Sequence, residues 1–138
     1  MKSRDTLIRL RKFDVDEKRQ KVASIEAMID DFKKMADDLD RQIVTEQQRA
    51  GVDDINHYAY PSFAKAAVGR RDNLMISIAD LEVKLDAANE ELQDAMKALK
   101  NIEVLEERDM TRTQAKQARD EQANLDEFAQ NMSRLVVR

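Results

Sequence analysis

A heptad repeat of apolar residues constrains the fold of this chain more than any other feature. Between residues 5 and 50, eleven positions follow one another in alternating steps of three and four, and nine of them are apolar. These positions are Ile8, Arg11, Val15, Lys18, Val22, Ile25, Ile29, Phe32, Ala36, Leu39 and Ile43. Because such a repeat keeps one narrow apolar stripe facing a partner helix, the sequence predicts a long coiled-coil helix over this segment.

The repeat stops at residues 51–61 and then resumes. Gly51 can end the first helix in the left-handed conformation, and the segment that follows is rich in Asp and Asn. Pro61 or Ser62 is expected to open a second helix, since proline suits the first helical turn and serine can cap free amide groups. The second stripe consists of Ala64, Ala67, Arg71, Leu74, Ile78, Leu81, Leu85, Ala88, Leu92, Ala95, Leu99 and Ile102.

The linker between the stripes sets how they pair. About eleven residues can turn the chain back on itself, so the stripes are predicted to pack antiparallel, with residue i opposite about residue 112 − i. The N-terminal end of the first helix then lies opposite about residue 107, and the second helix continues beyond it without a partner. The predicted fold class is therefore all-α: a long antiparallel two-helix coiled-coil hairpin with the second helix overhanging the first.

These considerations predict a single coiled-coil domain over residues 1–138. We expect the first helix over about 5–50, the hairpin tip over 51–61, and the second helix over about 62–135. The overhang is expected over about 108–135. An isolated helix with little apolar surface is marginal in water, so this overhang should fray or be held by another protein.

Two groups of apolar residues are candidates for partner binding. On the overhang, Leu125, Phe128, Ala129 and Met132 form an apolar patch at a place where the first helix has run out, and this favours docking. At the tip, three aromatic residues fall within six positions, and they either close the turn as a small cluster or form an exposed anchor for a partner. These aromatics are Tyr58, Tyr60 and Phe63.

Composition excludes several classes of function. The 28 acidic and 24 basic residues alternate along the chain with a net charge of −4, so the basic patch typical of nucleic-acid binding is absent. There is no cysteine and no glycine-rich phosphate loop, and His57 with Asp53 and Asp54 is better explained as a polar turn than as a metal site. We expect no catalytic site, no metal and no cofactor.

The sequence also bears on location. No window approaches the ~18 apolar residues that a membrane span requires, and the N-terminal residues lack an apolar signal core. The absence of cysteine fits a reducing cytosol. We therefore expect a cytoplasmic protein that reaches a membrane only through partners.

Several short segments, in their order and spacing, resemble the FliJ family of the bacterial flagellar type III export apparatus. The resemblance covers essentially the whole chain, from a Leu7/Leu10 helix through a polar turn to Tyr60-Pro-Ser-Phe63 at the start of the long helix. Its strongest elements are Leu105-Glu-Glu-Arg108-Asp and Leu125-Asp126-Glu127-Phe128-Ala129-Gln130.

This resemblance implies a stalk like that of rotary ATPases, whose terminal end enters the hexameric export ATPase and promotes its assembly. It implies further contacts with the cytoplasmic part of the export-gate membrane protein and with export chaperones, at the cytoplasmic base of the flagellum. The ATPase-facing residues would be Arg108, Leu125, Asp126, Glu127, Phe128 and Met132. The gate-facing residues would be Phe63, Ala67, Arg70 and Leu74, of which Phe63 matches the family and the others differ in size or polarity.

Three other readings remain open at this point. A passive coiled-coil scaffold could self-associate through the same stripes, and the stalk of an injectisome would share the architecture. A chaperone-type hairpin is a weaker alternative, because such proteins usually carry strand-forming segments for assembly and none is found near the tip.

Overall fold

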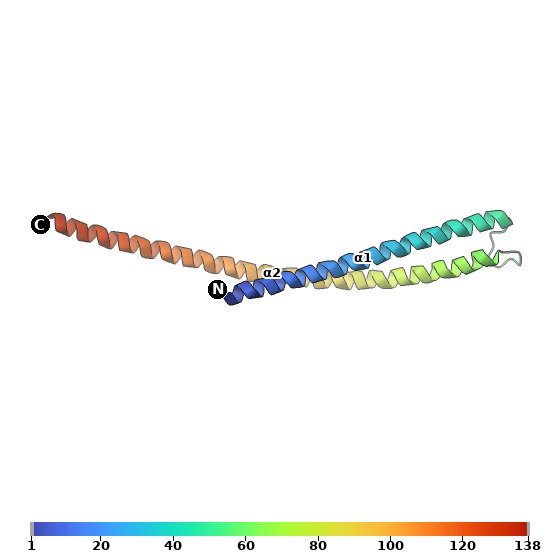
Figure 1. The fold of residues 1–138 in the computed structure, drawn as a ribbon, viewed down its shortest axis with the longest axis horizontal. Helices are drawn as coiled ribbons and strands as arrows, with labels where there is room; N and C mark the ends of the chain where they lie inside the picture. Colours follow the sequence, from blue (N-terminus) through green and yellow to red (C-terminus); the bar gives the residue numbers. More distant parts are fainter. Residues whose placement is uncertain (1, 138) are drawn as a thin grey trace. The chain divides into compact units, whose positions relative to one another are not determined.

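Two long helices make up the fold (Figure 1). The computed structural model describes residues 2–137, in which α1 spans Lys2–Ala50 and α2 spans Ser62–Val137. These residues contain no strand, and α1 and α2 pack against each other as a hairpin. The prediction of an all-α two-helix coiled coil is confirmed.

The chain divides into two compact units. One is Phe13–Ala95, which contains the hairpin tip, and the other combines Met1–Lys12 with Met96–Arg138. Neither α1 nor α2, over the residues that the structure describes, has a stretch long and apolar enough to cross a membrane.

The core of the unit Phe13–Ala95 is the predicted pair of stripes. Every apolar stripe residue within this unit is buried or partly buried. The central cluster consists of Val22, Ile25, Ile29, Ile78 and Ala88, with Phe32, Leu81, Leu85 and Leu92 packed against it. Removing these side chains from water is the main stabilising contribution available to so thin a structure.

Ion pairs between the helices confirm the antiparallel register. The Nζ of Lys21 lies 3.1 Å from the carboxylate of Glu91, the position that the relation 112 − i assigns to residue 21. The guanidinium of Arg71 lies 3.0 Å from Asp40, one residue from its assigned partner. Exposed pairs of this kind contribute about 0–1 kcal/mol each, so they mark the register more than they stabilise it.

The tip closes through backbone hydrogen bonds and one aromatic side chain. Gly51 has φ of 69°, and its N–H donates to the carbonyl of Gln47 at 2.9 Å, which ends α1 in the left-handed conformation that the sequence predicts. The buried Tyr60 accepts a hydrogen bond at its hydroxyl from Nε2 of Gln47 at 2.9 Å. Tyr58 and Phe63 remain exposed. The aromatic group therefore divides: one member closes the turn, and two face solvent.

Candidate partner-binding surfaces

The C-terminal part of α2 is a single helix with no covering element. In the described part of this segment, residues 110–136, every side chain is exposed. The segment contains neither glycine nor proline, so nothing in it interrupts a helix. We call residues 110–137 the overhang.

Large apolar side chains gather on one face of the overhang. Leu125, Phe128 and Met132 follow one another at i, i+3 and i+7, a spacing that places them on the same side of a helix. Leu125 and Phe128 are each more than 60% exposed, and Met132 is 47% exposed. We call these three residues the terminal patch. An exposed apolar patch is typical of a protein-binding site.

Two carboxylates lie on the other side of the helix from the terminal patch. Asp126 and Glu127 lie between two of its apolar members, and Oδ1 of Asp126 accepts a hydrogen bond from Nε2 of Gln122 at 3.0 Å. Arg108 is exposed near the start of the overhang. The six residues expected to face the ATPase, three apolar and three charged, are therefore all exposed to solvent. That they bind the ATPase stays a prediction.

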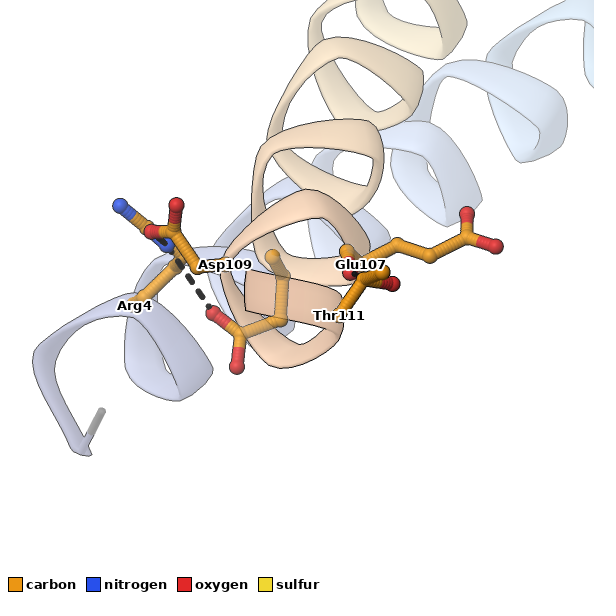
Figure 2. A network of polar contacts seen from close by, with 5 residues as sticks. Arg4, Glu107, Asp109 and Thr111 are labelled. Atoms are coloured by element: carbon orange, nitrogen blue, oxygen red, sulfur yellow. Dashed lines mark hydrogen bonds and ion pairs between the residues drawn. The ribbon is translucent and has the colours of Figure 1, made fainter. Parts of the chain in front are cut away.

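An ionic cluster ties α1 to α2 just before the overhang begins (Figure 2). The guanidinium of Arg4 pairs with the carboxylate of Asp109 and lies 3.3 Å from that of Glu106. One turn further, the hydroxyl of Thr111 donates to the carbonyl of Glu107 at 2.9 Å. The hydrogen bond from Arg4 lowers the pKa of Asp109 below its ordinary value of 3.8, and Arg112 and Arg108 add a smaller attraction.

This lowered pKa gives a pH-dependent prediction. Because Asp109 binds its proton less readily in the folded chain, the contact stabilises the fold above the ordinary carboxyl pKa and is lost as pH falls through the lower folded value. In an NMR titration we expect the Asp109 carboxyl to titrate below 3.8 in the native chain. Arg4→Gln should raise that midpoint, and an unchanged midpoint would contradict the contact.

The positions expected to face the export gate do not all reach the surface. Phe63 is 52% exposed in the first turn of α2, and Arg70 is also exposed. Leu74 is partly buried, whereas Ala67 is 1% exposed and lies in the stripe between the helices. A partner could touch the first three directly, but Ala67 only through its neighbours.

A groove beside these positions was not foreseen from the sequence. Arg70 and Leu74 line it together with Phe32, Met35 and Leu39 of α1. Phe63 lines an adjoining hollow, and Asp38 and Gln42 border both. One feature of the sequence could have indicated this groove: Met28 and Met35 lie seven residues apart, beside the apolar stripe of α1 and outside it.

The polar residues of the tip serve the turn. Oδ1 of Asp54 accepts from the N–H of Asn56, and Nδ1 of His57 accepts from the N–H of Ala59, both at 3.0 Å. Within residues 2–137, no group of three or more His, Cys, Asp or Glu side chains is placed to hold a metal ion. Hydrogen bonding within the turn accounts for the presence of Asp54 and His57 at the tip.

Comparison with known proteins adds one finding. A family model described as "Flagellar FliJ protein" matches residues 1–135, essentially the whole chain. Neither a curated protein nor a solved structure gives a significant match.

Proposed function

The chain belongs to the FliJ family of flagellar export components, and from that premise we propose that it is a non-enzymatic stalk and adaptor of the flagellar protein export machine. In this role it binds the hexameric export ATPase and promotes its assembly. It also contacts the cytoplasmic part of the export gate and export chaperones. The family is one of structural export components and is not a known enzyme family.

The observation that carries the ATPase contact is the exposed overhang. A lone helix of this length is marginally stable in water, and a hollow that encloses it would cover the terminal patch. Leu125, Phe128 and Met132 would then supply apolar anchors on one side of the helix, Asp126 and Glu127 would supply polar contacts on the other side, and Arg108 would contact the wall about 25 Å before Leu125. A hexameric ring offers an enclosing hollow of this kind.

The gate contact is supported by a different surface. Phe63 is an exposed aromatic residue, the type of side chain that most often dominates binding energy, and Arg70 and Leu74 lie beside it on the same helix. The two contacts use separate segments of α2. One chain could therefore hold the ATPase and the gate at the same time, at the cytoplasmic base of the flagellum and peripheral to the inner membrane.

Co-purification with the export ATPase tests this function. We expect the chain to bind the ATPase and to raise its rate of ATP hydrolysis, while the isolated chain hydrolyses no ATP. Sedimentation of the isolated chain separates this function from a passive scaffold. A tight, stable oligomer at micromolar concentration, combined with no effect on the ATPase, would contradict the proposal.

A further inference from the structure

In the unit Phe13–Ala95, one side of α2 faces away from the stripe that packs on α1. On it, Val83, Ala87, Glu90 and Asp94 follow one another in steps of four, three and four, the spacing of residues on one side of a helix. All four are exposed, and Val83 is exposed to 70%. The hairpin gives no reason for so exposed a valine there. We call these four residues the acidic series.

The other unit carries a series of opposite charge on α2. Arg108, Arg112, Ala115 and Arg119 also follow one another in steps of four, three and four, and all four are exposed. We call them the basic series. Each series extends over eleven residue steps, about 16 Å of helix, so the two agree in length as well as in spacing.

The charges at the facing ends of the two series have no counter-charge within the chain. Glu90 and Asp94 make no hydrogen bond or ion pair with any described residue, and the same holds for Arg108 and Arg112. Asp109 attracts both arginines, but its carboxylate already pairs with α1. Each series can therefore offer two charges to a partner.

The two series complement each other when two copies of α2 run antiparallel. Steps of four, three and four are the same in either direction, so residue i of one copy lies opposite residue 202 − i of the other along the whole of both series. Both acidic side chains then meet arginines, which allows charge-assisted hydrogen bonds. The four opposed pairs are Val83 with Arg119, Ala87 with Ala115, Glu90 with Arg112, and Asp94 with Arg108.

The uncharged members of the series suit the same contact. Ala87 meets Ala115, and two such short side chains let the helices approach closely. Val83 meets Arg119, whose aliphatic stem can cover an apolar neighbour while its guanidinium stays in water. We propose that the acidic series of one copy binds the basic series of a second copy, with the two α2 helices antiparallel.

The contact is reciprocal, because the relation 202 − i is the same when it is read from the second copy. Two copies therefore suffice, and the product is a dimer. The interface is narrow and its ion pairs lie at the surface, so the association is weak and is weakened further by salt. A partner that binds the overhang competes with the second copy. The inference concerns the isolated chain and does not rest on the proposed function.

Sedimentation velocity across a range of concentrations tests the contact. We expect the wild-type chain to dimerise at about tens of micromolar, and Glu90→Arg with Asp94→Arg to weaken dimerisation by at least about tenfold, because like charges then face each other. Arg108→Glu with Arg112→Glu should have the same effect. An equimolar mixture of these two double variants should dimerise again, since each reversed series meets its complement in the other chain.

The matched control is Asp30→Arg with Asp31→Arg, at two exposed positions of α1. It changes the net charge by the same amount as the reversal of the acidic series, and it should leave dimerisation unchanged. Circular dichroism verifies that every variant keeps its helical content. Three results would overturn the proposal: a wild-type chain that stays monomeric throughout, an equal loss in the control, or a mixture that does not associate.

Discussion

Removal of residues 110–138 is expected to abolish stimulation of the export ATPase while leaving the hairpin folded. The described side chains from 110 to 136 are all exposed, and only the first few of them border α1, where Met110 and Gln114 line open hollows with Ile8 and Arg4. The ionic cluster of Arg4 with Glu106 and Asp109 lies before the cut. We therefore expect the shortened chain to keep the helical content of residues 2–109 and a nearly unchanged melting temperature.

The loss of stimulation should be nearly complete, because the cut removes the whole terminal patch. Interfaces of this kind depend on a few central apolar residues, and three of the candidates are Leu125, Phe128 and Met132. Full-length Phe128→Ser serves as the companion variant, since it keeps the chain length and should lower stimulation strongly. A shortened chain that stimulates hydrolysis as well as the native chain would show that the overhang is not the ATPase-binding segment.

Placing a carboxylate in the stripe is expected to remove most of the stability of the unit Phe13–Ala95. Ala88 is 1% exposed and packs in the central cluster with Val22, Ile25, Ile29 and Ile78. A buried, unpaired charge costs about 3–5 kcal/mol, a large part of the roughly 5–15 kcal/mol that a folded domain possesses. Ala88→Asp should therefore lower the melting temperature by at least about 10 °C.

The neighbouring alanine provides the control for this substitution. Ala87 is exposed on the same turn of α2, so Ala87→Asp changes helix propensity and net charge by the same amounts without burying the charge. Its cost should stay below about 1 kcal/mol. Urea denaturation followed by circular dichroism compares the two variants. Equal destabilisation by both would mean that residue 88 does not face α1.

The apolar stripes could be predicted from the sequence because they depend only on periodicity. Seven-residue spacing determines which side chains face the partner helix, and a short linker leaves one simple way to pair the two stripes. For that reason Lys21 lies against Glu91 as the register requires. Gly51 was predictable as well, since few residues other than glycine adopt positive φ at a helix end.

The groove on the flank of the stripes and the conformation of the tip were harder to predict from the sequence. The flank depends on the size of the residues that meet across the helices. The groove exists because the short Ser77 lies opposite Met35, and a heptad pattern does not weigh such pairs. Tyr60 is buried and Tyr58 exposed, a difference that depends on the loop conformation and on the hydrogen bond from Gln47. The burial of Ala67 could have been predicted from the sequence, because Ala67 occupies a heptad position that faces the other helix.

The most direct test of the stalk and adaptor function is site-specific photo-crosslinking in the assembled export complex. A photoreactive phenylalanine analogue would replace Phe128, Phe63 or, as a control, the exposed Val83 in the first third of α2. We predict that position 128 captures the export ATPase, that position 63 captures the cytoplasmic part of the export gate, and that position 83 captures neither. Capture of the ATPase at position 83 as efficiently as at 128, or no capture at 128, would contradict the account.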